Sequence, residues 1–320
     1  MGLPLTIFTA AGQQSLGLVA SLGGLAALYC AALRRIDRMH VLPLVVIGLV
    51  IAAVAGVTCS GSLWLTIGCL TVIAAIASAL TFGVGLGPPG PIMFVNVAAI
   101  SARMAAPPEL NGAAMNGGFV VAMVAIGGVV AYLVVIAPLA LPSVRRREGP
   151  PLGLRALFPD FELDAAMTAV TVRVVVAVAL CGVVSGSLGV HRSYWVIIAA
   201  VAVLQAGNSR RMTTIRAVQR VLGTMVGVVF FGAIVAISPS GAWLVLTIML
   251  LQFATEVVVT RNYALALVFI TPLALMIAST GNADSPLVSV MGRIVDTLLG
   301  ATIAMAVFLG HQLVHGRRRR

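Results

Sequence analysis

Two arginines one helical turn apart are the strongest candidates for chemistry in this chain. Arg216 and Arg220 lie in RAVQRVLGTMVG, and their spacing of four residues places both side chains on one face of a helix. A guanidinium group binds a carboxylate through two parallel hydrogen bonds and stays charged when it is partly desolvated. The pair therefore predicts a binding site for an organic anion. The alternative interpretation is an anchor that only marks the membrane side.

Four more charged residues fall inside long apolar stretches, where a charge costs at least about 2.5–3.5 kcal/mol. Arg293 and Asp296 are three positions apart and can pair within one helix. Arg173 and Glu256 are expected at similar depth and could pair between helices. We expect Arg293 to bind substrate, and Glu256 and Asp296 to be candidates for proton coupling, with Glu256 preferred because its partner lies on another helix. The alternative is that both pairs only neutralise charge within the packing.

Aromatic residues form a further candidate group, and metal ligands do not. Tyr194 and Trp195 are adjacent and could stack on an aromatic solute, or anchor a helix end at the membrane interface. The histidines have no partners at metal-ligand spacing, and the cysteines form no C-x-x-C pair. We therefore predict neither a metal nor a cofactor. The residues considered and rejected as ligands are His191, His311, His315, Cys30, Cys59, Cys69 and Cys181.

The elements that must position these residues are membrane-spanning helices. The chain has 320 residues, of which 60% are hydrophobic and 9% charged. Its apolar runs approach the roughly 20 residues that cross a hydrocarbon core. We predict an all-α polytopic membrane protein with about eleven transmembrane helices: Leu5–Leu33, Val41–Thr58, Leu63–Leu80, Pro91–Ser101, Gly112–Leu141, Ala165–Gly189, Trp195–Ala206, Arg216–Ile237, Ala242–Val258, Tyr263–Ser279 and Leu287–Leu313.

The arginines also predict the orientation of these helices. All 20 basic residues are Arg, and they cluster at the ends of apolar runs rather than on a solvated basic face, so the net charge of +11 is not a nucleic-acid signal. With the N-terminus outside, sixteen arginines fall on the cytoplasmic side and two, Arg103 and Arg192, on the external side. The positive-inside rule then places the C-terminus in the cytoplasm. We expect the membrane to be a bacterial plasma membrane.

Two predicted helices are too short for simple spans. Trp195–Ala206 would rise only about 18 Å, and Pro91–Ser101 follows GVGLGPPGP, which cannot form continuous helix. Irregular backbone at membrane depth is tolerated where it lines a cavity, so both segments are candidates for a solute pathway. The alternative is that the boundaries are misplaced and the glycines serve helix packing.

The chain contains an internal duplication at an offset of about 175 to 182 positions. Arg34-x-x-x-Arg38 aligns with Arg216-x-x-x-Arg220, and SGSLW after position 59 aligns with SGAW after position 239. An extra helix between the halves would make them parallel, related by a pseudo-twofold axis along the membrane normal. We predict a first repeat at 1–142, a short cytoplasmic linker at 143–164, a second repeat at 165–313 and a basic cytoplasmic tail at 314–320.

The second half resembles a known transporter family. The succession HRSYWVIIAAVAVLQ, RAVQRVLGTMVG, RNYALALVFITPLAL and GRIVDTLLGA resembles the fusaric acid resistance family, also called the aromatic acid exporter superfamily. The resemblance implies export or permeation of organic anions, especially aromatic carboxylates. The first half keeps Arg34 and Arg38 but has Leu42-Pro43 where the second has Gly223-Thr224. Many family members also have a large cytoplasmic domain between the membrane halves, and none lies between the halves here.

These observations predict a transporter, not an enzyme, that exports organic anions, with aromatic carboxylates preferred. The expected partners are a small organic anion and the lipid bilayer, without nucleic acid, and self-association is left open. The alternatives are a passive anion channel and a membrane assembly protein without transport activity. A membrane enzyme is disfavoured because no loop contains a nucleophile with its base, a phosphate-binding loop or metal ligands. The substrate-binding candidates are Arg216, Arg220, Arg293, Tyr194, Trp195, Arg34 and Arg38.

Overall fold

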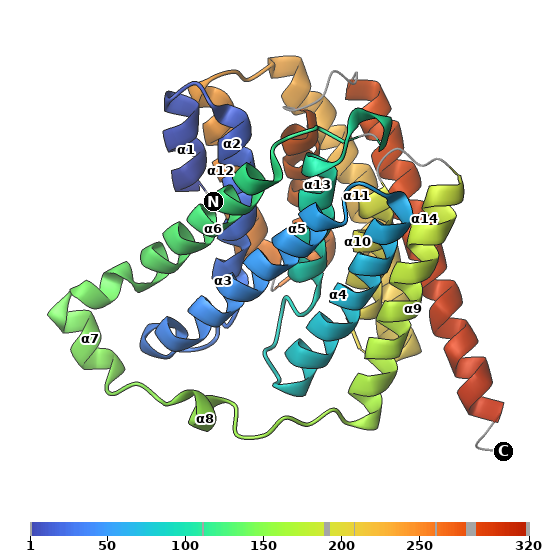
Figure 1. Cartoon of the computed structure of the whole chain (residues 1–320), viewed down its shortest axis with the longest axis horizontal. Coiled ribbons are helices and arrows are strands. Elements are labelled where there is room, and N and C mark those ends of the chain that lie inside the picture. Colours follow the sequence, from blue (N-terminus) through green and yellow to red (C-terminus); the bar gives the residue numbers. More distant parts are fainter. Residues whose placement is uncertain are drawn as a thin grey trace. The chain divides into compact units, whose positions relative to one another are not determined.

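In the computed structural model of the chain, every regular element among the described residues is a helix (Figure 1). The chain divides into two compact units. The described residues are 2–110, 112–188, 193–207, 209–259, 261–279 and 286–317. Unit 1 comprises Leu3–Thr168 and unit 2 comprises Ala169–Arg320, so the division falls inside a helix.

In unit 1 the central helix α3 packs against α5 and α6, while α2 packs against α6 and α4 against α5. The core is a continuous apolar cluster from these helices, in which Tyr29, Leu42 and Val124 are almost fully buried. The elements of this unit are α1 (Gly2–Ala10), α2 (Gln14–Gly23), the 3₁₀ helix η1 (Gly24–Leu28), α3 (Arg35–Thr58), α4 (Leu63–Gly83), α5 (Ile92–Ala105), η2 (Pro108–Leu110), α6 (Gly117–Ile136), η3 (Ala137–Ala140), α7 (Pro142–Glu148) and α8 (Leu154–Leu157).

In unit 2 the central helix α11 packs against α13 and α14, while α10 packs against α14 and α12 against α13. The short helix α10 is buried along most of its length. The elements are α9 (Ala165–Ser187), whose first residues belong to unit 1, α10 (Ser193–Leu204), α11 (Arg210–Ile237), α12 (Ala242–Val259), α13 (Tyr263–Ser279) and α14 (Pro286–Arg317).

Glycines set the closest helix contacts in both units. A Cβ atom added at Gly127 of α6 would lie 1.7 Å from the carbonyl oxygen of Ala20 in α2. A Cβ added at Gly300 of α14 would lie 2.4 Å from the carbonyl oxygen of Val196 in α10. Backbones can approach this closely only where the side chain is a hydrogen atom, the device that membrane helices use to pack.

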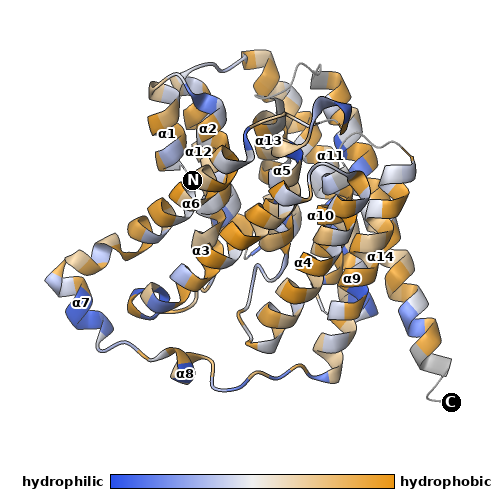
Figure 2. Ribbon diagram, in the orientation of Figure 1, coloured by the Kyte–Doolittle hydropathy of each residue, from blue (hydrophilic) through white to orange (hydrophobic). Residues whose placement is uncertain are grey.

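Within the part of the chain that the structure describes, seven helices are long and apolar enough to cross a membrane. Large apolar side chains stay exposed along them, including Val229 and Ile237 of α11, as expected where lipid rather than water is the solvent. Apolar residues dominate these helices, whereas α7 presents the charged run Arg145–Glu148 (Figure 2). The prediction of a multi-pass, all-helical membrane protein is confirmed. The seven helices are α3, α4, α6 continued by η3, α9, α11, α12 and α14.

The predicted count of eleven spans is not confirmed, because four apolar helices are shorter. They are Gln14–Leu28, Ile92–Ala105, Tyr194–Leu204 and Tyr263–Ile277. Two of them match the segments that the sequence marked as too short, around Pro91–Ser101 and Trp195–Ala206. The short length of these two segments is therefore a property of the fold and not a boundary error.

The first predicted helix, Leu5–Leu33, is wrong as a single element. The structure has α1, a break, α2 and then the 3₁₀ helix η1 in its place. Gly12 in the break has φ of 73°, in the left-handed region that glycine adopts without strain. Hydropathy could not locate this break because the segment is apolar on both sides of it.

Helix α11 begins six residues earlier than predicted, at Arg210 instead of Arg216. Arginine, methionine and threonine are compatible with helix, but a hydropathy window registers only the apolar part. Arg216 and Arg220 therefore lie in the second and third turns of α11, not at its end.

Candidate arginine and aromatic cluster

The arginine pair of α11 surrounds one tyrosine. The Cζ atom of Arg216 lies 4.1 Å from the ring centroid of Tyr263, at the first residue of α13. Nη1 of Arg220 donates a hydrogen bond of 3.0 Å to the hydroxyl oxygen of the same tyrosine. The predicted shared face is thus present, and Tyr263 spans both guanidinium groups through its ring and its hydroxyl.

Close packing of α11 on α13 produces this arrangement. A Cβ added at Gly223 would lie 2.5 Å from the carbonyl oxygen of Ala264, and one at Gly227 would lie 2.7 Å from Cβ of Thr271. Gly223 and Gly227 thus allow the close approach of α13 to α11. Because Gly223 follows Arg220 by one turn, the contact brings the start of α13 against the arginine pair.

A second pair on α14 and α10 continues the site. The Cζ atom of Arg293 lies 4.7 Å from the ring of Trp195, and Tyr194 and Trp195 have centroids 5.5 Å apart in a tilted contact. Arg293 is also close enough to Arg220 to be repelled by its like charge, and the charge of Asp296 offsets this repulsion, so the two pairs are neighbours. We call Arg216, Arg220, Arg293, Tyr263 and Trp195 the arginine cluster.

Burial distinguishes the members of the arginine cluster. Arg220 and Arg293 are 4% and 3% exposed, and the Nε atom of each is buried without a hydrogen-bond partner among the described residues. Arg216 is half-buried. A buried polar group without a partner costs about 1–3 kcal/mol, and such groups in native proteins are commonly satisfied by water, an ion or a ligand. The two buried guanidiniums therefore have hydrogen-bonding capacity that the described protein groups leave unused.

Trp195 is also buried, with 4% of its surface exposed, and its ring is occupied by Arg293. A residue that anchors a helix at the lipid–water interface would instead present its ring outward. Its surroundings therefore favour a role inside unit 2 over the interfacial alternative.

The two carboxylates considered for proton coupling lie in different surroundings. Asp296 is 1% exposed and lies on α14, three residues after Arg293. Glu256 is exposed on α12 and accepts a 2.7 Å hydrogen bond from Nε2 of Gln252. Arg173, its predicted partner, lies 4.8 Å above the ring of Phe308 and donates from Nε to the carbonyl oxygen of Ala169. Asp296, not Glu256, is thus the carboxylate beside the arginine cluster.

Arg34 is engaged with the linker. Its Nε and Nη2 atoms lie 2.6 and 3.1 Å from the two carboxylate oxygens of Asp37, and Nη1 donates to the carbonyl oxygen of Glu148 at 2.8 Å. The amide of Leu152 donates to Asp37, and the amide of Ile36 donates to the Glu148 carboxylate. These contacts fasten the linker to the start of α3, and we call them the linker clasp.

Arg38 binds the end of the broken first segment. Its Nη2 atom donates to the carbonyl oxygens of Ala27 at 2.6 Å and Tyr29 at 3.2 Å. The hydroxyl of Tyr29 in turn donates to the carbonyl oxygen of Gly90 at 2.6 Å. Arg34 and Arg38 are therefore directed at carboxylate and carbonyl groups of the protein. The arginines of the arginine cluster are instead directed at aromatic rings and a hydroxyl.

Replacing Arg34 by glutamine is expected to release the linker without unfolding the membrane helices. Limited trypsin cleavage within Arg145–Arg155 should become at least several times faster, because Asp37 and Glu148 lose their charged donor. Arg35→Gln is the matched control, since Arg35 is exposed on the same turn. Equal cleavage rates in wild type and Arg34→Gln would show that the linker clasp does not hold this segment.

Three site residues escaped the sequence analysis. Tyr263 stands in the quoted segment RNYALALVFITPLAL, but a tyrosine beside an apolar run is indistinguishable from a core residue. Thr224 and Thr271 are fully buried, and their hydroxyls have no hydrogen-bond partner among the described residues. Thr224 lies on α11, just past Arg220, and Thr271 lies on α13. Their hydroxyls extend the polar surface of the contact between these helices. In the sequence, only the dipeptides Thr271-Pro272 and Gly223-Thr224 could have pointed to these two threonines.

No group of three or more potential metal ligands occurs among the described residues. His191 lies outside those residues, and so do the side chains of His315 and the last arginines. The four cysteines are free thiols.

Comparison with known proteins finds a family match in the second half of the chain. Residues 161–307 match the family described as fusaric acid resistance protein-like. An uncharacterized membrane protein of Bacillus subtilis, YvaC, is 36% identical over 121 residues, which are 37% of this chain and 19% of that protein. No solved structure matches.

Two further relatives are uncharacterized proteins. One, ORF2 of Neisseria gonorrhoeae, is 28% identical over 155 residues, or 48% of this chain and 36% of the relative. The other, from Haemophilus influenzae, is 29% identical over 152 residues, or 46% of this chain and 20% of the relative. The matched segments thus span from a fifth to about a third of the relatives' own lengths.

The family match and the membrane-protein relative agree with the seven helices of crossing length in supporting a membrane transporter-like protein. The region 161–307 contains every residue of the arginine cluster. The resemblance found in the sequence is confirmed for this region: residues 161–307 match the family described as fusaric acid resistance protein-like.

Proposed function

We propose that this chain is a transporter that exports organic anions, preferably aromatic carboxylates, and that unit 2 contains the anion site. The observation on which the proposal rests is the pair of buried guanidiniums, Arg220 and Arg293, each with an Nε atom that has no described partner. Two guanidinium groups in a low-dielectric interior attract a carboxylate strongly, because little water screens their charge.

The aromatic rings of the arginine cluster support an aromatic substrate. Tyr263 and Trp195 each lie under a guanidinium group, so cationic and aromatic surfaces alternate across the site. An aromatic carboxylate presents the complementary surfaces, an anionic edge and a flat apolar face. Asp296 is our candidate for coupling to protons, because a carboxylate beside Arg293 would change the charge of the site when it titrates. We propose transport rather than catalysis because the side chains of the arginine cluster are suited to binding an anion and include no nucleophile.

The experiment uses the full chain in phosphatidylethanolamine–phosphatidylglycerol vesicles and radiolabelled phthalate, an aromatic dicarboxylate that is ionised at neutral pH. Phthalate accumulation against its gradient, driven by an imposed proton gradient and abolished by a protonophore, supports the exporter. Phthalate movement only down its electrochemical gradient supports the channel alternative. In that case the protonophore changes the driving force but does not stop the movement. No movement above protein-free vesicles, for phthalate or a panel of aromatic acids, contradicts transport and favours an assembly role.

We propose further that the two units are repeats. The long helices α3, α4 and α6 correspond to α11, α12 and α14, and the short helices α2 and α5 correspond to α10 and α13. In support, corresponding helices form corresponding packing pairs, such as α3 with α5 and α11 with α13, or α2 with α6 and α10 with α14. The turns with Ser60-Gly61 and Ser240-Gly241 fall between corresponding helices. The parallel orientation is proposed from the arginine distribution.

Labelling of single cysteines tests the proposed orientation, with the N-terminus outside and the C-terminus cytoplasmic. Gly149→Cys in the linker is expected to be protected from an impermeant maleimide in intact cells, and to react after permeabilisation. Asn111→Cys and Asn282→Cys are expected to react from outside, although both positions lie outside the described residues. Labelling of Gly149→Cys in intact cells would contradict this topology.

A further inference from the structure

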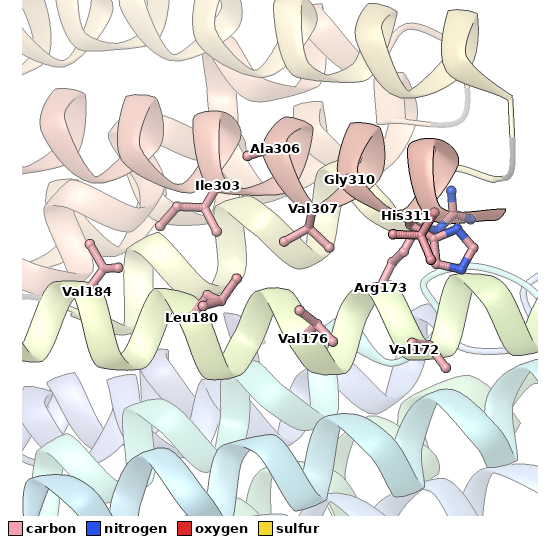
Figure 3. A pocket seen from close by; sticks show the side chains of 11 residues that line it. Val172, Arg173, Val176, Leu180, Val184, Ile303, Ala306, Val307, Gly310 and His311 are labelled. Atoms are coloured by element: carbon pink, nitrogen blue, oxygen red, sulfur yellow. The ribbon is translucent and has the colours of Figure 1, made fainter. Parts of the chain in front are cut away.

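A long apolar groove runs between α9 and α14 in unit 2 (Figure 3). Its volume is about 480 Å³, within the range of about 300–1,000 Å³ that is typical of ligand sites. The two helices run in opposite directions along it, with Val184 and Ile303 at one end and Arg173 and His311 at the other. The lining residues are Val172, Arg173, Val176, Leu180, Val184, Ile303, Ala306, Val307, Gly310, His311 and Val314.

Each wall of the groove is a row of lining residues on one helix. On α9 the lining residues Val172, Val176, Leu180 and Val184 recur every four positions, so they form one face of the helix. The first three are 47%, 42% and 43% exposed, which leaves the groove open along its side. An exposed apolar stripe of this length on a membrane helix faces hydrocarbon.

The basic side chains that line the groove lie at one of its ends. Arg173 is almost fully buried beneath that end, and His311 is only partly exposed beside it (Figure 3). Among the described residues that line the groove, none is acidic. A fixed positive charge at low dielectric attracts an anion over several ångströms, and an imidazole can donate a hydrogen bond to it.

We infer that this groove binds one acyl chain of an anionic membrane phospholipid, with the phosphate of the headgroup at the end formed by His311 and Arg173. The shape favours a chain, because the groove is long, apolar and without polar groups along its length to orient a compact solute. The charge favours an anionic lipid over a zwitterionic one, whose choline would lie against the same positive end. The groove is lined by α9 and α14 and does not include the arginine cluster, so this site is separate from the proposed anion site.

The test fills the groove at Gly310. Gly310 lines the groove, and no atom lies within 4 Å of a Cβ added there, so a larger side chain starts in open space. Gly232→Leu is the matched control, since Gly232 is an exposed helical glycine on α11 with equally open surroundings. Purified full chain in detergent is titrated with dioleoylphosphatidylglycerol or dioleoylphosphatidylcholine, and bound lipid is counted by native mass spectrometry.

Wild type is expected to bind phosphatidylglycerol at least about tenfold more tightly than phosphatidylcholine. Gly310→Leu should weaken phosphatidylglycerol binding about tenfold or more, because displacing about two methylene groups is enough for that change. Gly232→Leu should bind as wild type does. His311→Gln should reduce the preference for phosphatidylglycerol while retaining binding of the chain.

Several results would overturn the inference. Unchanged lipid binding by Gly310→Leu would exclude the groove, and an equal loss in Gly232→Leu would show a non-specific effect. Equal binding of the two lipids by wild type would contradict the anionic headgroup. A wild-type dimer that dissociates in Gly310→Leu would assign the groove to a second copy of the chain instead of a lipid.

Discussion

Replacing Arg220 by glutamine is expected to lower phthalate transport about 10- to 100-fold in the vesicle assay, while insertion and folding persist. The size follows from a charge-assisted hydrogen bond, which contributes about 1.5–3 kcal/mol. Arg220 is the member of the arginine cluster that is both buried and directed at Tyr263, so no neighbouring side chain replaces it. Glutamine keeps a hydrogen-bond donor near the tyrosine hydroxyl but removes the charge and the second donor edge.

Lysine at the same position distinguishes recognition from packing or topology. Lysine keeps the charge but loses the planar fork, so Arg220→Lys should recover only part of the transport rate if the site binds a carboxylate through two hydrogen bonds. If Arg220 only marks the cytoplasmic side, lysine should be fully equivalent and glutamine nearly silent. Arg211→Gln is the matched control, because Arg211 is an exposed arginine on the same helix.

The double replacement of Arg216 and Arg220 by glutamine extends this test to the whole pair. We expect a larger loss of phthalate transport than from replacing Arg220 alone. The additional loss should be modest, because Arg216 is half-buried and contacts the ring of Tyr263. Full phthalate transport by the double variant, at normal membrane levels, would remove the pair from the mechanism. The corresponding changes at Arg34 and Arg38 should affect transport much less, because the structure directs those side chains at groups within unit 1.

The sequence alone predicted the helical membrane architecture because hydrophobicity is a sum over many residues and tolerates local errors. The spacing of Gly223 and Gly227 also indicates close helix approach, since small residues four positions apart in an apolar helix let backbones pack together. The break at Gly12 escaped because hydropathy does not distinguish a helix from a turn inside an apolar segment. Helix starts were misplaced for the opposite reason, because polar first turns such as that of α11 give no hydropathy signal.

Contacts between distant segments could not be predicted. Arg34 meets the Glu148 carbonyl across more than a hundred residues, and no local pattern specifies that partner. Tyr263 reaches the arginine pair only because α13 starts where α11 carries Gly223. Glu256 was preferred as the coupling carboxylate on the assumption that it faces the bundle, whereas the structure leaves it exposed on α12. Spacing predicts the face that residues share, while tertiary packing decides what that face meets.

Replacing Gly127 or Gly300 by alanine is expected to destabilise the protein strongly. The added Cβ would overlap a backbone carbonyl oxygen, of Ala20 at 1.7 Å or of Val196 at 2.4 Å. No side-chain rotation relieves a clash with backbone, so the helices must separate. We expect a destabilisation of about 1–3 kcal/mol or more, and a fall of several degrees in the thermal unfolding midpoint.

Two other glycines provide controls of the opposite sign. Gly68 and Gly232 are exposed within helices and have open space where a Cβ would lie. Alanine is favoured over glycine in a helix interior by about 1 kcal/mol, so Gly68→Ala and Gly232→Ala should leave the midpoint unchanged or raise it. Unchanged midpoints in Gly127→Ala and Gly300→Ala would contradict the close helix contacts described in both units.

The same two variants also separate the units by function. Gly300 fixes the contact between α14 and α10, the helices that present Arg293 and Trp195, so its displacement should misplace these two groups. Gly127 fixes the corresponding contact between α6 and α2 in unit 1. At a temperature where both variants are folded, Gly300→Ala should weaken phthalate binding, measured by calorimetry, and Gly127→Ala should not. Equal losses would indicate that both units contribute to the anion site, whereas a loss only in Gly127→Ala would move the site to unit 1.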